Sequence, residues 1–215
     1  EDFVEMASVG SNDYINIVVQ FDRAPGYATT YGDWKDTRRF YIKKGDTPSS
    51  TPLQNMGELN MGSRATLQNF IVWAVQNYPA KKYALVLWNH GGGWRNKRAK
   101  AKIVKAICWD ETSNDACLYM VDVQQAILSA QNTTGKKLSL IGFDACLMGM
   151  IEVATDIKDL ADVMVGSEEV EPGEGWPYDM VLPQLAANPT MTAQQLGTII
   201  VDQYANFYKS KDATI

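Results

Sequence analysis

Apolar positions along this chain follow two different periods. Continuous runs of apolar and β-branched residues predict core strands at 14–21, 82–88 and 137–143, and residues 161–170 predict a further strand. Apolar residues at helical spacing predict helices at 63–78, 120–132, 147–160, 178–187 and 192–209. This alternation of strands and helices predicts an α/β fold, in which a mostly parallel central sheet is sandwiched between helices in three α/β/α layers.

The limits of several elements carry local signals. Ser63 is a favourable N-cap residue for the helix predicted at 63–78, and Pro79 ends that helix. Residues 34–44 predict a charged strand in an edge hairpin, and residues 103–109 predict a further short strand. The helix over 147–160 is expected to begin directly after the strand that ends at Phe143.

Composition narrows the kinds of site that the chain can contain. The 215 residues, 46% of them hydrophobic, suffice for one α/β domain. A single histidine excludes a three-histidine zinc centre and an HExxH protease motif. Cys108, Cys117 and Cys146 form no CxxC pair, so a zinc ribbon is excluded. Free thiols are favoured over a Cys108–Cys117 bridge, which stays open, and the compartment is undecided.

The net charge of the chain limits the kinds of partner that it can bind. The formal net charge of −5 argues against nucleic acid as the main partner, and no apolar run is long enough for membrane insertion. The acidic N-terminal segment shows no signal peptide. Six of the 20 basic residues nevertheless lie within residues 95–105, where there is no acid. This basic segment is either a solvated loop or a segment that has a role in the function.

The single histidine lies at the end of a predicted core strand. His90 follows Asn89 and precedes three glycines, which allow backbone N–H groups to approach a ligand closely. A histidine beside exposed amides suits a catalytic base next to an oxyanion hole, and the alternative is a turn histidine that only ends the strand. Esterases share the HGGG peptide, but they need a GxSxG nucleophile and a second histidine, both absent from this sequence.

The partner nucleophile is expected at a neighbouring strand end. Cys146 lies where the strand 137–143 passes into the predicted helix, whose N-terminal dipole favours a thiolate. The alternative is a small buried core residue, the usual state of a free cysteine. Cys108, within an apolar segment, fits that alternative better, and Cys117 is ambiguous.

These motifs together resemble the clostripain family of cysteine peptidases, in the clan of caspases, legumains and gingipains. The resemblance rests on WNHGGGW at 88–94, FDACLMG at 143–149 and SEEVEPGEGW at 167–176. It implies a caspase-like fold and a His–Cys dyad without an obligatory third acid. His90 would be the base and would protonate the leaving amine, Cys146 would form the acyl-enzyme, and the amides of Gly91 and Cys146 would hold the oxyanion.

The resemblance also implies cleavage after a basic residue, with peptides or proteins carrying Arg or Lys at P1 as substrates. Asp144 matches the family's acidic S1 residue, and a carboxylate can pair with a guanidinium there. Its alternative role is a helix N-cap. Glu174 is our candidate for a second acid of the S1 pocket, or else a solvated loop acid, and Trp176 could form an apolar wall.

The basic segment then becomes a candidate processing site. Family members are processed into light and heavy chains in the interval between histidine and cysteine, and the two chains can stay associated. We expect a zymogen that cleaves itself within 95–105, at Lys105–Ala106 or alternatively at Lys100–Ala101. The family resemblance favours a secreted or extracytoplasmic protein.

The expected organisation is one caspase-like peptidase domain over 1–215, lacking the family's first strand and part of its C-terminal region. No cofactor is expected to be required. Calcium enters by resemblance only, and the acids Glu168, Glu169 and Glu171 are as easily a solvated loop. Two other functions remain: a catalytically silent binding or scaffold domain, and a metal-binding module of His90, Cys108 and Cys117 that lacks a usual ligand spacing.

Overall fold

The computed structural model describes residues 1–93 and 106–211, which divide into two compact units. The first unit contains residues 1–58 and the chain from Glu174 onward, and the second contains Leu59–Gly173. Each unit has its own hydrophobic core.

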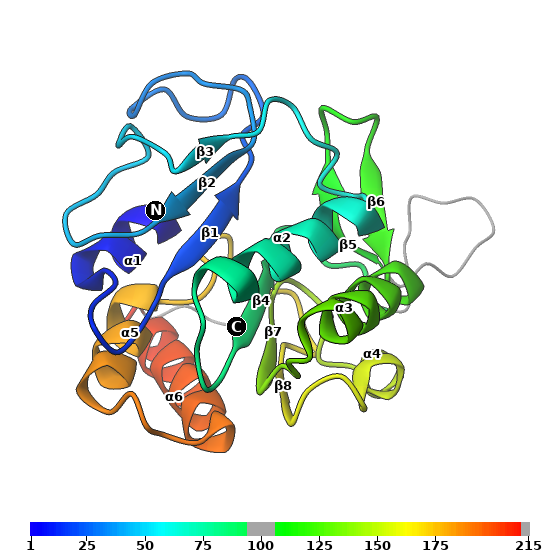
Figure 1. Cartoon of the computed structure of the whole chain (residues 1–215). Coiled ribbons are helices and arrows are strands. Elements are labelled where there is room, and N and C mark those ends of the chain that lie inside the picture. Colours follow the sequence, from blue (N-terminus) through cyan, green and yellow to red (C-terminus); the bar gives the residue numbers. More distant parts are fainter. Residues whose placement is uncertain (94–105, 212–215) are drawn as a thin grey trace. The chain divides into compact units, whose positions relative to one another are not determined.

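A parallel sheet forms the centre of the second unit (Figure 1). It contains β4 (Ala84–Trp88), β7 (Leu140–Asp144) and β8 (Val163–Val165), in the order β4-β7-β8. Every residue of β7 is buried, as expected for the central strand of a parallel sheet. The register pairs Trp88 with Asp144, so β4 and β7 end side by side.

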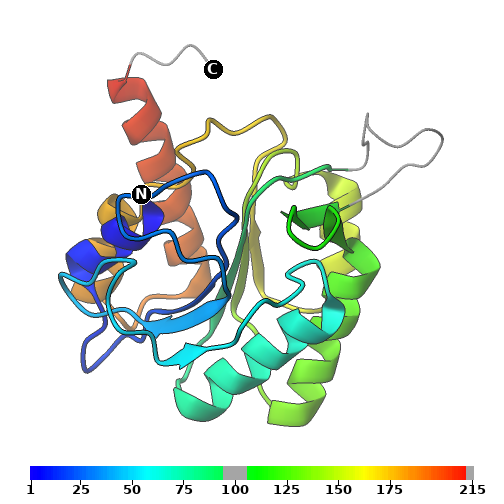
Figure 2. The same cartoon turned by 90° about the horizontal axis from the view of Figure 1, so that it is seen from above.

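Three helices lie on the same side of this sheet (Figure 2). They are α2 (Arg64–Asn77), α3 (Met120–Thr134) and α4 (Ile151–Ile157). Their apolar faces join the strands in one core that includes Leu67, Val123, Ile127 and Ile141. The helical period in the sequence thus arises from burial of one face of each helix. The mixed α/β class with a parallel sheet is confirmed.

The segment between β7 and α4 corrects one prediction. The helix does not follow the strand directly: turns occupy the intervening residues and α4 begins at Ile151. Leu147 adopts a left-handed φ of 63°, which interrupts any regular helix. Gly149 passes so close to the neighbouring chain that an added Cβ would lie 2.6 Å from the Gly166 carbonyl oxygen. Tertiary packing therefore delays the helix.

A hairpin completes the second unit. It consists of β5 (Ala106–Asp110) and β6 (Ala116–Tyr119), with a bulge between Ile107 and Asp110. The predicted strand at 103–109 is confirmed for its described part, and residues 103–105 lie outside the described residues. Asp110 closes the turn by accepting hydrogen bonds from Thr112 and Ser113, and its other oxygen accepts the Met61 N–H at 2.8 Å.

The first unit contains an antiparallel sheet of β1 (Val18–Phe21), β2 (Arg38–Tyr41) and β3 (Gln54–Asn55). Residues 34–44 contain β2, which pairs with β1 as a hairpin, but β2 is the middle strand of this sheet, so the expected edge position is wrong. Phe3 of α1 (Asp2–Val9) packs against Phe40 in the small core of this unit.

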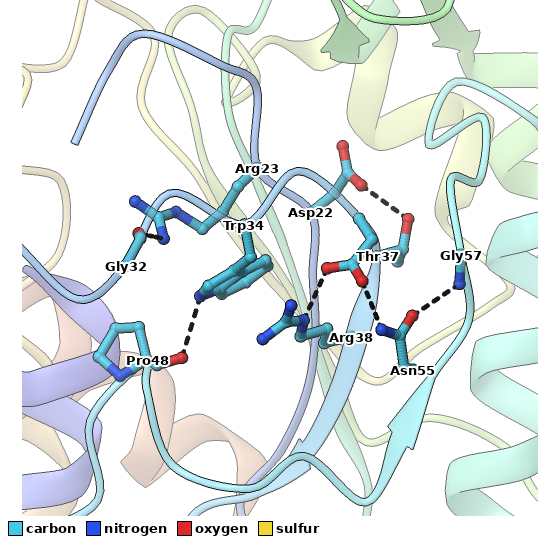
Figure 3. A network of polar contacts seen from close by, with 10 residues as sticks. Asp22, Arg23, Gly32, Trp34, Thr37, Arg38, Pro48, Asn55 and Gly57 are labelled. Atoms are coloured by element: carbon cyan, nitrogen blue, oxygen red, sulfur yellow. Dashed lines mark hydrogen bonds and ion pairs between the residues drawn. The ribbon is translucent and has the colours of Figure 1, made fainter. Parts of the chain in front are cut away.

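Trp34 packs against that core, and its ring lies between Arg23 and Arg38 (Figure 3). The guanidinium groups of Arg23 and Arg38 lie 4.7 and 4.3 Å from the centre of its ring, and its Nε1 donates to the Pro48 carbonyl. These contacts give the loop before β2 a structural role.

The last two predicted helices are α5 (Tyr178–Ala187) and α6 (Ala193–Ser210). Thr192 and Gln195 form a capping box at the start of α6. α5 packs against α1, where the Glu5 carboxylate accepts the Tyr178 N–H at 3.0 Å. No helix in the described part of the chain is long and apolar enough to cross a membrane.

Candidate active site

His90 occupies the turn that follows β4. Asn89, with φ of 117°, bends the chain out of the strand, and the side chain of His90 is exposed. The glycines then run beside the hairpin: Gly91 bridges to Ile107, and the Gly92 N–H donates to the Ala106 carbonyl at 2.9 Å. The chain is thereby fixed on both sides of the histidine.

The glycine turn lies directly against the backbone of Cys146. A Cβ added at Gly91 would lie closer than 3.0 Å to the Cys146 carbonyl oxygen, and one at Gly93 would lie 2.7 Å from the Leu147 carbonyl oxygen. Both glycines are therefore required for close backbone approach. Residues that are far apart in the sequence meet here because β4 and β7 are adjacent and parallel.

The thiol of Cys146 is half-buried and has two backbone neighbours. The Glu171 N–H donates to Sγ at 3.3 Å, and the Glu171 carbonyl lies 3.8 Å from Sγ as an acceptor of the thiol proton. Because α4 begins only at Ile151, its N-terminus does not provide the dipole expected at Cys146. The Glu171 amide is the polar contact that the structure shows instead.

The segment 167–171 holds the turn that contains Cys146. The Leu147 N–H donates to the Glu169 carbonyl at 3.0 Å, and the Gly149 N–H donates to the Ser167 carbonyl at 2.7 Å. Sequence reasoning did not assign this role to the backbone of 167–171. The only sequence signal was the family block SEEVEPGEGW, which shows that the segment matters but not how.

Asp144 is the last residue of β7 and its exposed fraction is 3%. The alternative role of helix N-cap is wrong, because Met150 occupies that position of α4. A buried carboxylate thus lies two residues before the candidate nucleophile, at the end of the central strand.

The other two cysteines differ from Cys146. Burial, together with the nearby Cys117, raises the pKa of the Cys108 thiol to about 12. Burial also raises the pKa of Cys117. Both are free thiols in the structure, and Cys108 packs against the core as expected. The raised pKa values favour the protonated form of both thiols near neutral pH.

The remaining predicted residues lie in the first unit, at the start of β5 or outside the described residues. Glu174 and Trp176 belong to the first unit, where Glu174 pairs with Lys211 at 2.7 Å and the exposed fraction of Trp176 is 3%. Ala106 begins β5 and is fully buried. The other processing candidates, Lys100, Ala101 and Lys105, lie outside the described residues.

The acidic segment expected as a possible calcium site does not form a ligand cluster. In the stretch of the second unit that the structure describes, the carboxylates of Glu168, Glu169 and Glu171 do not converge within ligand distance of one another. A calcium site built from these three side chains would need a rearrangement of the segment.

Comparison with known proteins decides the family. The model of the clostripain family of peptidases matches residues 1–214. The chain belongs to the clostripain family. Clostripain of Hathewaya histolytica is 30% identical over 255 aligned residues, an alignment that covers 93% of this chain and 47% of clostripain.

Solved structures of the same peptidase class share the fold. A secreted C11 cysteine protease from Bacteroides thetaiotaomicron, in complex with an irreversible peptide inhibitor, superposes with a TM-score of 0.71 at 22% identity, covering 98% of this chain and 53% of that one. An inactive zymogen C11 protease from Parabacteroides distasonis gives a TM-score of 0.67 at 22% identity, with 97% and 53% covered. The chain thus has the caspase-like fold of these proteases and spans about half the length of its relatives.

Proposed function

We propose that this chain carries the catalytic dyad of a cysteine endopeptidase that cleaves after Arg or Lys. One observation carries the proposal: the glycine turn that follows His90 lies on the backbone of Cys146, at the joint carboxyl ends of β4 and β7. A histidine, a thiol and backbone amides thereby share one edge of a parallel sheet, where α/β proteins place their reactive groups. Family membership agrees with this arrangement.

The proposed reaction follows from these groups. His90 takes the thiol proton, Sγ of Cys146 attacks the carbonyl carbon of the P1 residue, and His90 returns the proton to the leaving amine. Water, activated by His90, then hydrolyses the thioester and releases the second product. The Glu171 N–H stabilises the thiolate before attack.

Two amides are suited to hold the oxyanion. Among the hydrogen bonds of the described residues, none uses the N–H of Gly91 or of Cys146. The sheet contact beside Gly91 instead engages the next amide, that of Gly92. Both N–H groups are therefore available to a developing negative charge, as an oxyanion hole requires.

An extended substrate also finds a free backbone edge. Ser167, Glu169 and Glu171 direct backbone groups towards the turn of Cys146. The segment bends at Glu168 and Glu169, so it is not a regular strand. The backbone groups of Glu168 and Val170 carry no hydrogen bond within the described part of the chain, so they can pair with a peptide strand.

Selection of a basic P1 residue is assigned to Asp144. Its buried carboxylate at the end of β7 would pair with a guanidinium or ammonium group far more strongly than an exposed acid. Asp144→Asn is expected to lower kcat/KM for P1 Arg at least 100-fold, with little effect on P1 Ala. Glu174 and Trp176 remain the proposed second acid and apolar wall.

Self-cleavage within 95–105 is part of the proposal. Ala106 is buried in β5 and its carbonyl accepts the Gly92 N–H, so cutting at Lys105–Ala106 requires this strand end to open. This burial favours the alternative bond, Lys100–Ala101. Mass spectrometry of purified wild type and Cys146→Ala locates the cut. An intact wild-type chain, or equal cleavage of both proteins, would contradict autolysis.

Fluorogenic peptides with Arg, Lys, Asp or Ala at P1 test the activity itself. Wild type should hydrolyse the Arg and Lys peptides, whereas Cys146→Ala and His90→Ala should not, and Cys117→Ala is the matched control that keeps activity. Hydrolysis after Asp but not Arg would overturn the assigned specificity. A processed chain that hydrolyses none of the peptides would favour a binding or scaffold domain.

A further inference from the structure

One large apolar side chain lies in solvent next to the candidate nucleophile. The exposed fraction of Val170 is 64%, although the residues on both sides of it are fixed. Glu169 accepts the Leu147 N–H, and the Glu171 N–H donates to Sγ of Cys146. An exposed valine held in place on a restrained backbone is a ready contact for another apolar group.

The distance from the thiol limits what Val170 can touch. Glu171 N lies 3.3 Å from Sγ, and consecutive Cα atoms are about 3.8 Å apart across a trans peptide bond. Val170 therefore lies roughly two residue lengths from the reacting sulfur. A peptide paired with its backbone edge would place a residue adjacent to P1 beside the valine.

The surroundings of Val170 define the chemistry of that neighbour. Glu168 and Glu169 are exposed and Glu171 is half-buried, so three acids flank the valine. An apolar substrate side chain gains from burial against the valine. An acidic side chain at the same position is repelled by the flanking carboxylates.

We propose that Val170 is a specificity-determining residue, which selects substrates with an apolar rather than acidic residue next to the basic P1 residue. The inference rests on the proposed function and deepens it. The substrate class becomes a two-residue signal: Arg or Lys at P1, accompanied by Leu, Val or a similar side chain at P2 or P1′.

Internally quenched peptides test this directly. P1 is fixed as Arg or Lys, and P2 and P1′ are varied one at a time among Leu, Ala and Asp. Wild type should cleave the Leu peptide at least about 5-fold faster than the Ala peptide at one of the two positions, measured as kcat/KM. The Asp peptide should be the slowest of the three.

Variants separate the valine from the rest of the protein. Val170→Ser should reduce the Leu-to-Ala ratio to less than 2-fold and leave cleavage of the Ala peptide nearly unchanged, by the loss of about two methyl groups of contact. Val170→Lys should raise the rate for Asp relative to Ala. Val121→Ser, at another exposed valine (54%) on α3, is the matched control and should keep the wild-type ratio.

The outcomes separate the two proposals. Cleavage after Arg or Lys with equal rates for Leu and Ala, or a Leu preference that survives in Val170→Ser, would overturn the role of Val170 alone. Absence of cleavage of every peptide by a processed wild-type chain would overturn the proposed function and this inference with it.

Discussion

At the residue scale, the close approach of Gly91 to Cys146 is the feature on which the proposed site depends. A side chain at position 91 would occupy the space of a backbone carbonyl, which cannot rotate away. Position 173 offers the opposite case, since an added Cβ there meets nothing within 4 Å. The same substitution therefore has very different consequences at the two glycines.

Gly91→Ala is expected to lower kcat/KM at least 100-fold and to destabilise the fold by about 2–4 kcal/mol, because the turns of His90 and Cys146 must separate. Peptide hydrolysis and thermal unfolding measure the two effects. Gly173→Ala should change neither. Equal behaviour of the two variants would contradict the close contact.

Alkylation distinguishes the three thiols. Burial raises the pKa of the Cys108 thiol to about 12, so this thiol stays protonated at pH 7.5 and ionises only as the pH rises towards 12. Brief iodoacetamide treatment at pH 7.5 should therefore modify Cys146 before Cys108. Peptide mass spectrometry then identifies the labelled cysteine. Labelling of Cys108 before Cys146 would contradict the assignment of the nucleophile.

At the element scale, the contact between α1 and α5 contains a carboxylate in an unfavourable place. Burial raises the pKa of Glu5 to about 7, against the hydrogen bond from the Tyr178 N–H, and the nearby Asp179, Asp2 and Glu1 raise it further. The folded protein thus binds a proton at Glu5 that the unfolded chain, with a pKa near 4.5, has already released. Stability is therefore lost as the pH rises from about 4.5 through 7.

Glu5→Gln should remove this pH dependence, because the amide oxygen can still accept the Tyr178 N–H without charge. After allowance for solvent screening of a partly exposed group, we expect a gain of about 1 kcal/mol at pH 8, or roughly 2–4 °C in Tm, and no gain at pH 4.5. Thermal unfolding at both pH values measures it. Asp202→Asn on α6 is the control, and an identical gain there would attribute the effect to net charge alone.

The limits of the helices show what the helical pattern in the sequence could and could not predict. α2, α3, α5 and α6 lie within a few residues of their predicted limits, since Ser63, Gly135 and Thr192 are local end signals. α4 begins later than predicted. Its start depends on the packing of Gly149 against Gly166 and Ser167, and no local pattern contains that contact.

At the scale of the whole molecule, the two compact units have separate cores. Phe40 lies in the core of the first unit and Ile141 in that of the second, and both are almost fully buried. Truncation of such residues to alanine typically costs about 2–5 kcal/mol. The two losses should appear in different parts of the chain.

Hydrogen exchange followed by mass spectrometry checks this. Phe40→Ala should accelerate exchange chiefly in residues 1–58 and 174–211, and Ile141→Ala chiefly in residues 59–173. Uniform acceleration by either variant would show that the chain unfolds as one cooperative body. In that case the expectation of a single domain over 1–215 would hold for stability.

The sequence by itself determined the fold class and indicated the candidate reacting residues. One histidine in a glycine turn left a single candidate base, and its motif together with FDAC indicated the family. These signals are local, since periodicity, turn formers and short motifs need no knowledge of distant contacts.

Only the tertiary structure decided how those residues are held. Gly91 contacts Cys146, the Glu171 N–H rather than a helix end contacts the thiol, and Val170 is exposed beside them. These features bring together segments that are distant in the sequence. They arise because β4 and β7 run parallel and end together, while the segment after β8 returns along the turn of Cys146. Strand order and chain return depend on packing of the whole unit, which no local pattern records.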